Sequence, residues 1–140
     1  MNKWMPPLGV QTKQEPIELT SSELDVNTSL ALNVLYYQLR HEKKYNILDL
    51  GPAMGANVDF FSQFSCKIYI EDLYHTLSSF DYFSPEDGFT YQTVFDYLLP
   101  YTHNTRFDII MSWDIFNYLE RDEFKFLISH LDNFCHKGTL

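Results

Sequence analysis

The feature that most constrains the fold of this chain is an apolar run that ends in an acid and then turns through two glycines. It reads LDLGPAMGANVDFF over residues 48–61 and is preceded by the residues YNI. A short apolar run followed by glycine is typical of a parallel strand that is buried on both faces. After Gly55 the residues Val58, Phe61 and Phe64 recur every three positions, which predicts a helix. A strand, a tight turn and a helix are therefore expected here in succession.

Two further strands and a final helix are predicted from the residues that follow. CKIYIEDLY at 66–74 and RFDIIMSWD at 106–114 are short, apolar and rich in β-compatible residues. An apolar stripe predicts the last helix over about 121–136, with Gly138 as its C-terminal stop.

Helical patterns also lie before and between these strands. Apolar residues near helical spacing predict a helix at roughly 29–41, which a polar residue at 27 or 28 can cap. SPEDGFTYQTVFDYLLP, residues 84–100, has Ser84 as a candidate N-cap and Pro85 at the first helical position. This segment therefore predicts a capped helix.

Strands that alternate with helices predict an α/β fold, with a mostly parallel sheet covered on both faces. Residues 27–140 are expected to form this domain. Residues 1–26 contain scattered proline and glycine without a sustained period, so we expect an irregular N-terminal arm.

Length and charge limit the class of protein. The chain has 140 residues, enough for one core, and its 19 acidic against 10 basic side chains give a net charge of -9. That charge repels phosphate backbones, so a nucleic-acid partner is not expected. No apolar stretch approaches the roughly 20 residues of a membrane span, and the first residues lack a signal-peptide pattern. We therefore expect a cytoplasmic protein with no membrane partner.

The two cysteines do not indicate a metal or disulfide framework. Cys66 and Cys135 are far apart in sequence and belong to no CxxC or HxxxH motif. We expect buried thiols and no metal.

Polar residues gather at the carboxyl ends of the three predicted strands. Asp49 to Gly55 follow the first, Glu71 and Asp72 the second, and Ser112 to Asp114 the third. Ligands of parallel α/β sheets lie beyond these ends, near the point where the strand order reverses. The three stretches are therefore expected to form one site.

Residue types in this site suggest a nucleoside ligand. Gly51 allows a sharp turn out of the strand, and Gly55 allows the next helix to approach both ligand and strand closely. The N-terminus of that helix offers N–H groups to a carboxylate or phosphate. Asp72 lies seventeen positions after Gly55, where an acid can accept both hydroxyls of a ribose. Spacing favours Asp72, and Glu71 is the alternative.

These stretches resemble the class I S-adenosylmethionine-dependent methyltransferases. LDLGPAMG is similar to that family's first motif, with Asp49, Gly51 and Gly55 matching and Ala53 in place of the middle glycine. YIEDLY is similar to the second motif, which carries the ribose-binding acid. The segment from FDIIMSWD to the end resembles the fourth strand and the helix after it. The resemblance covers about residues 27–140 and implies a Rossmann-like three-layer sandwich.

The resemblance implies a role for each matching residue. Asp49 would face the methionine amino group of S-adenosyl-L-methionine, and the backbone from Gly51 through Pro52 and Ala53 to Gly55 would pass beside the methionine and ribose. Ser112, Trp113 and Asp114 would border the methionine and the transferred methyl group. Trp113 or Phe116 would form an apolar wall near the sulfonium, although core packing is the favoured role of Phe116.

Two departures from the family pattern concern the cofactor. Ala53 adds a methyl group beside it. The third strand, whose last acid or amide meets the adenine, is replaced here by the predicted helix. Asp96 could meet the adenine only if part of residues 89–95 were a strand.

The sheet is expected to be incomplete in its C-terminal half. The chain stops at HKGTL, where the family's fifth strand would begin. The apolar strand DIIMSW would then present an open edge. Further residues of a longer protein or another chain are expected to complete the sheet.

The expected activity is methyl transfer to an acceptor that the sequence does not identify. A hydroxyl or amine acceptor needs a general base, for which Asp114, His75 and His103 are candidates by residue type alone. One alternative is a methyltransferase-like domain that has lost catalysis and acts in binding or assembly. The other is a nicotinamide-dependent dehydrogenase, but its G-x-G-x-x-G motif is not matched by the Pro52 and Ala53 that follow Gly51.

Overall fold

The computed structural model describes residues 30–79 and 90–140. The chain divides after Gln38 into two units. The described part of the first unit is the helix α1, Leu30–Gln38, which confirms the helix expected at 29–41. The arm expected at 1–26 lies outside the described residues.

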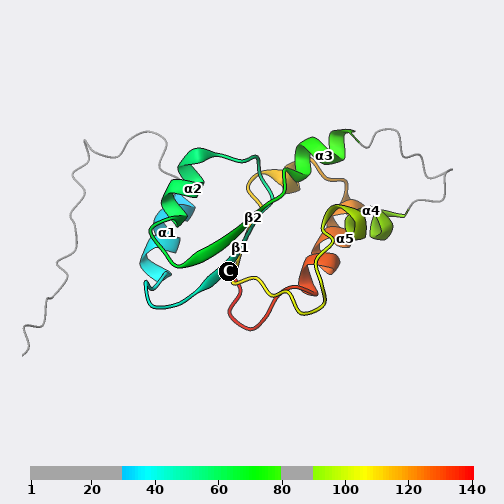
Figure 1. The fold of residues 1–140 in the computed structure, drawn as a ribbon. Coiled ribbons are helices and arrows are strands. Elements are labelled where there is room, and N and C mark those ends of the chain that lie inside the picture. Colours follow the sequence, from blue (N-terminus) through cyan, green and yellow to red (C-terminus); the bar gives the residue numbers. More distant parts are fainter. Residues whose placement is uncertain (1–29, 80–89) are drawn as a thin grey trace, which may run out of the picture. The chain divides into compact units, whose positions relative to one another are not determined.

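The second unit contains a parallel sheet of three strands (Figure 1). They are β1 (Tyr45–Asp49), β2 (Cys66–Ile70) and β3 (Ile109–Met111), in the order β2-β1-β3. Both pairings are parallel. The prediction of a mixed α/β protein with a parallel sheet is therefore confirmed.

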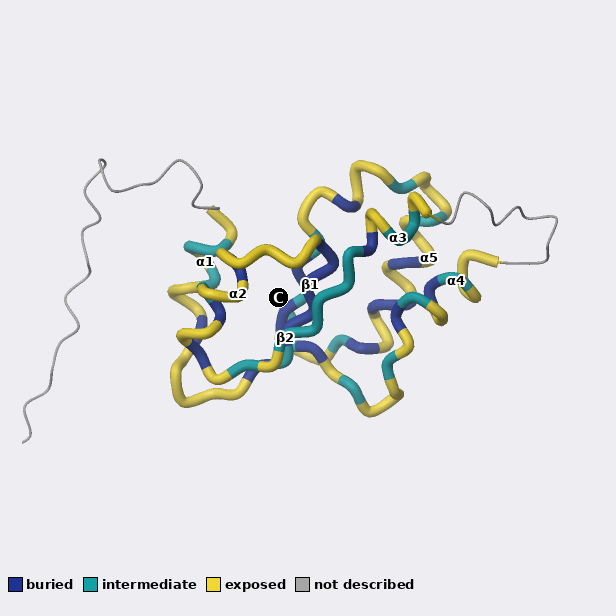
Figure 2. The backbone as a smooth tube through the Cα atoms, turned by 45° about the horizontal axis from the view of Figure 1, so that its top comes forward, coloured by how far each residue is buried: buried dark blue, intermediate teal, exposed yellow. Residues whose placement is uncertain are grey.

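The central strand β1 is buried because it has a neighbour on each edge and side chains packed on each face. Ile47 pairs with Ile68 and Ile109, whereas Leu48 pairs with Tyr69 and Ile110 on the opposite face. Ile47 and Leu48 have no exposed surface. The continuous apolar run in the sequence is thus the consequence of a strand covered on both faces. Figure 2 shows β1 coloured largely as buried.

Helices lie on the two sides of this sheet. On one side is α2, Gly55–Phe61; on the other are α4, Tyr91–Leu98, and α5, Arg121–Asp132, which contact each other (Figures 1 and 2). The short helices α3, Leu73–Ser79, and η2, Ile115–Asn117, follow β2 and β3. Within residues 30–79 and 90–140, no helix has the length and apolar character needed to cross a membrane.

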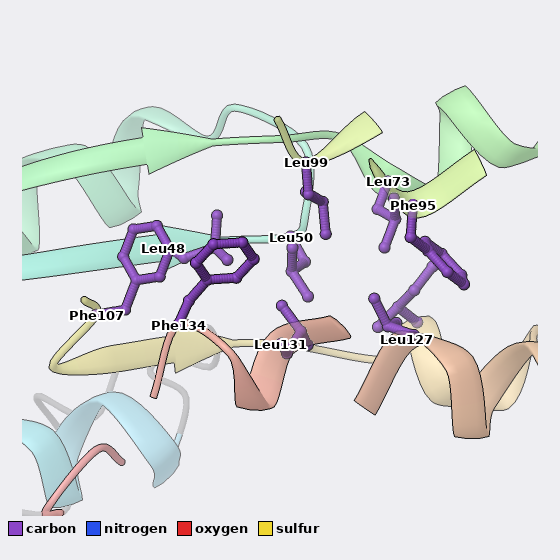
Figure 3. Packing of buried hydrophobic residues seen from close by; sticks show 10 residues of the cluster. Leu48, Leu50, Leu73, Phe95, Leu99, Phe107, Leu127, Leu131 and Phe134 are labelled. Carbon is purple, nitrogen blue, oxygen red and sulfur yellow. The ribbon is translucent and has the colours of Figure 1, made fainter. Parts of the chain in front are cut away.

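The main hydrophobic core lies between the sheet and the pair α4 and α5. Side chains from these elements and from the loops beside them point toward one another in Figure 3. The buried members are Leu48, Leu50, Leu73, Phe95, Leu99, Phe107, Ile115, Leu127, Leu131 and Phe134.

Helix α4 confirms the helix expected within 84–100, but its described cap differs. Thr90 is the N-cap, and its hydroxyl accepts the backbone N–H of Thr93 at 3.2 Å. The expected signals Ser84 and Pro85 lie outside the described residues. Phe95 is buried, as its place on the apolar stripe predicted.

Three boundaries differ from the predictions. The segment expected as strand at 66–74 ends at Ile70, because Asp72 accepts the backbone N–H of His75 and α3 begins at Leu73. Strand β3 covers only three residues of 106–114. Helix α5 ends at Asp132, with Asn133 as C-cap.

The proposed role of Gly138 as the stop of that helix is therefore wrong. Gly138 has φ of 99° in a later turn, where its missing Cβ permits the left-handed conformation. Helix α5 begins instead with a capping box that the sequence analysis did not identify. Glu120 and Glu123 accept each other's backbone N–H groups there.

The outer edge of β3 is partly covered by the last residue of the chain. The N–H of Leu140 donates to the carbonyl of Asp108, and the N–H of Ile110 donates to the carbonyl of Leu140, both at 2.9 Å. Leu140 thus bonds to the residues on either side of Ile109, which is the hydrogen-bond pattern of neighbouring parallel strands. The expected apolar edge is thus capped at this point by Leu140.

At the amino ends of the strands, Asp108 joins three parts of the chain. Its carboxylate accepts the Lys43 ammonium and the backbone N–H of Asn46, both at 2.9 Å, and lies 3.3 Å from Nε2 of His136. Partial burial alone would raise the pKa of the Asp108 carboxyl. The bonds from Asn46 and Lys43 outweigh burial and lower that pKa below its ordinary value.

We predict that Asp108→Asn lowers the free energy of unfolding by about 1–3 kcal/mol at pH 7, because hydrogen bonds to a charged group are lost. A lowered folded-state pKa stabilises the fold above the unfolded pKa of about 3.9, and this stabilisation disappears as the pH falls through the folded pKa. The difference between wild type and variant should therefore shrink below about pH 4. Urea unfolding over a pH series measures it.

The matched control is Asp59→Asn, on the exposed surface of α2. It should change stability by less than about 0.5 kcal/mol. Equal stability of wild type and Asp108→Asn at pH 7 would contradict the assigned role of Asp108.

Candidate functional site

The strand order reverses at β1, which has β2 on one side and β3 on the other. At the carboxyl ends, the N–H of Leu50 donates to Met111 at 2.9 Å, and the N–H of Glu71 donates to the carbonyl of Asp49 at 2.8 Å. The chain segments that leave the three strands therefore begin side by side. This edge of the sheet is where open α/β folds bind ligands.

Asp49 is the last residue of β1, and only 2% of its surface is exposed. Oδ1 accepts the backbone N–H of Gly51 at 2.9 Å and the indole N–H of Trp113 at 2.7 Å. Oδ2 accepts the side-chain amide of Asn57 at 3.2 Å. The carboxylate is thus held by three donors, none of which carries a full positive charge.

This distinguishes Asp49 from Asp108 at the other end of the sheet. Asp108 is paired with the Lys43 ammonium, whereas Asp49 has no salt bridge to any described residue. Buried carboxylates are stabilised by hydrogen bonds or by an opposite charge, and among the described residues Asp49 has the hydrogen bonds alone. Asp49 is therefore suited to bind a cationic group of a ligand.

The two glycines of the loop differ in what surrounds them. A Cβ at Gly51 would lie 2.6 Å from Cδ1 of Trp113 and 3.2 Å from Oδ1 of Asp49. Gly51 is therefore required by close approach of the indole. A Cβ at Gly55 would meet no atom within 4 Å, so the expected close approach of α2 to the strand at Gly55 is wrong.

Trp113 follows β3 and lies against the loop after β1. Its backbone φ is 45°, the only positive φ of a non-glycine residue in the described part of the chain. A bulky residue rarely adopts this conformation, which requires compensation from its surroundings. The indole contact with Asp49 and Gly51 is such a compensation.

The acids at the end of β2 have partners within the protein. Glu71 is half-buried and accepts the hydroxyl of Tyr101 at 3.1 Å. Burial and the neighbouring Glu71 carboxylate raise the pKa of the Tyr101 phenol, which keeps the phenol protonated as a donor. Asp72 is also half-buried, and its Oδ1 accepts the N–H of His75 at the start of α3.

The remaining residues expected at this edge lie in the loops around Asp49. Pro52 and Ala53 are exposed between β1 and α2. Ser112 is half-buried directly after β3, and its carbonyl accepts the N–H of Ile115. Asp114 is exposed at the start of η2.

Asp96 is placed elsewhere. Because residues 91–98 form α4, the described part of 89–95 contains no strand, and the condition for an adenine contact is not met there. The Asp96 carboxylate accepts the amide of Gln92 at 3.0 Å and lies 3.2 Å from Nδ1 of the buried His130 in α5. It contributes to the contact between α4 and α5.

The other side chains considered from the sequence are peripheral. His75 on α3 and His103 in a turn are exposed. Phe116 packs edge-to-face on Phe124 of α5, with ring centroids 5.1 Å apart, but 37% of its surface is exposed, so the favoured role in core packing is wrong. Cys66 and Cys135 are half-buried, and burial raises the pKa of both thiols.

Two residues of the site were not identified from the sequence. Asn57 is buried in α2 against Asp49, whereas Met54 is the N-cap of that helix. The available signal in the sequence was a polar side chain in the first turn of a helix that otherwise carries apolar residues toward the core. Tyr101 follows Pro100 in a connection and carried no signal, because its contact with Glu71 spans thirty residues.

Comparison with known proteins gave no relative for this chain. No family model, curated protein or solved structure matches it.

We predict that Asn57→Leu destabilises the protein by about 1–3 kcal/mol, because it leaves Oδ2 of the buried Asp49 without its donor. Urea unfolding measures the change. The same substitution should cost less in an Asp49→Asn background, where no buried charge needs the amide. Equal costs in both backgrounds would show that Asn57 acts through packing alone.

Proposed function

We propose that this chain forms a Rossmann-like S-adenosylmethionine-binding domain whose activity is methyl transfer. The observation that carries the proposal is the buried Asp49 carboxylate at the point where the strand order reverses. Its donors are all uncharged, so it can still gain a cationic partner. The acids at the end of the adjacent β2 are the second support.

The residues present fit the two polar ends of such a ligand. Asp49 matches an α-ammonium group, because a buried carboxylate gains most from a charged donor. Glu71 or Asp72 at the end of β2 matches a pair of ribose hydroxyls. Each already accepts one bond within the protein, and an ionised carboxylate has about four acceptor positions.

Aromatic residues on the segments that follow β2 and β3 match the rest of the ligand. Trp113 is exposed enough, at 39%, to offer a ring face to a cation. Tyr74 of α3 and Tyr118 after η2 contact each other with tilted rings, their centroids 4.4 Å apart, and are also exposed. Apolar surface of this kind excludes water from a reacting methyl group.

In methyl transfer the protein mainly positions the reactants. When bound, S-adenosylmethionine supplies a methyl group that is already activated by the positive sulfur. The side chains of this chain would hold the donor and acceptor in line and exclude water. Asp114 at the start of η2 is the acid beside this edge that could accept a proton from the acceptor.

Isothermal titration calorimetry with S-adenosylhomocysteine tests the proposal. Saturable binding to the 140-residue chain is expected. Asp49→Asn should weaken it by roughly tenfold to hundredfold, because a charge-assisted hydrogen bond is lost. Glu71→Gln and Asp72→Asn are compared in the same assay, and at least one should weaken binding by about tenfold.

Asp122→Asn is the matched control, because this acid is exposed on α5 and its ion pair among residues 30–79 and 90–140 is with Lys125. It should leave binding unchanged. Binding of NADH without S-adenosylhomocysteine would favour a dehydrogenase instead. Binding of neither compound would remove the support for this function.

A further inference from the structure

The indole of Trp113 is hydrogen-bonded to the Asp49 carboxylate, which the proposed ligand would also bind. Its indole N–H donates to Oδ1 of Asp49 at 2.7 Å. Oδ1 also accepts the N–H of Gly51, so both of its acceptor positions are used. A ligand ammonium can bind Oδ1 only after one of these donors leaves. Among the described residues, Oδ2 accepts only the amide of Asn57 and keeps one position, but Asp49 is 2% exposed, so a ligand reaches neither oxygen until a group that covers the carboxylate moves.

The indole is the donor that can leave. The N–H of Gly51 belongs to the backbone directly after β1, and its position is set by the strand. Trp113 lies at the surface and reaches Asp49 through a rotatable side chain. Asp49 is 2% exposed and Trp113 is 39% exposed, so solvent reaches the indole but not the carboxylate beneath it.

The backbone of Trp113 supports a conformation that can change. A positive φ at a tryptophan is unfavourable by itself and persists only while other contacts compensate for it. Among the described residues, its side chain donates a hydrogen bond to Asp49 and closely approaches Gly51. Loss of the indole contact would therefore also release the backbone strain.

We propose that Trp113 is a gate on Asp49 that closes the site until an amine-bearing ligand displaces the indole. This inference rests on the proposed function, because the amine is that of S-adenosylmethionine or S-adenosylhomocysteine. The ligand exchanges a neutral N–H donor on Oδ1 for a charged one. Only molecules in which the indole has left Asp49 can bind the ligand. The apparent dissociation constant is therefore the intrinsic one divided by the fraction of open molecules.

The indole N–H of Trp113 reports the gate directly. The sequence has two tryptophans, so Trp4→Phe leaves Trp113 as the single indole. In a chain labelled with ¹⁵N at the indole, the Trp113 resonance should show slow hydrogen exchange without ligand. Saturation with S-adenosylhomocysteine should shift the resonance and accelerate its exchange.

Two variants test the gate independently. Trp113→Phe keeps an aromatic ring but has no N–H to hold it on Asp49, so it should bind S-adenosylhomocysteine about tenfold more tightly by calorimetry. Gly51→Ala adds a Cβ 2.6 Å from Cδ1 of the indole and should move the Trp113 resonance without ligand. Gly55→Ala, where a Cβ meets nothing within 4 Å, is its control and should leave the resonance in place.

The outcomes separate this inference from the proposed function. If S-adenosylhomocysteine binds while the resonance and its exchange stay unchanged, or if Trp113→Phe binds no more tightly than wild type, the gate is wrong and the function stands. If neither wild type nor Trp113→Phe binds, both proposals fail. Binding by Trp113→Phe alone would be the strongest support for the gate.

Discussion

A negative charge buried at the end of the central strand organises the structure around it. Taking an ionised carboxylate out of water costs several kcal/mol unless hydrogen bonds or an opposite charge replace the lost solvation. Asp49 obtains three N–H donors from three places: the loop after β1, helix α2 and Trp113 in the segment after β3. Two local sequence choices serve this arrangement: Gly51 leaves room for the indole that donates to Asp49, and Asn57 supplies an amide donor.

The carboxylates at the two ends of the sheet have different partners, and the proposed ligand site depends on this difference. Asp108 at the amino end is paired with a lysine ammonium and ties the starts of β1 and β3 to the C-terminal segment. Asp49 at the carboxyl end is surrounded by neutral donors. One carboxylate is therefore compensated within the protein, and the other remains able to attract a cation.

Much of the fold could be predicted because its elements are encoded locally. The run YNILD has no polar face, as expected for a strand with a helix layer on each side, and Phe95 lies on the apolar stripe of its helix. Helix α3 was missed because two acids after β2 were interpreted as a strand end and possible ligands. One of them, Asp72, in fact accepts the N–H of His75 in the first turn of a helix.

The sequence by itself determined that three short strands alternate with helices and that acids and glycines follow the strands. These features depend on neighbours within a few residues, so period, capping and composition reveal them. Only the tertiary structure decided which of those acids are buried, and with which partners. Trp113 lies sixty-four positions from Asp49, and no local pattern indicates that its indole covers that carboxylate. Contacts of this kind depend on strand order and register, which are set when the sheet assembles.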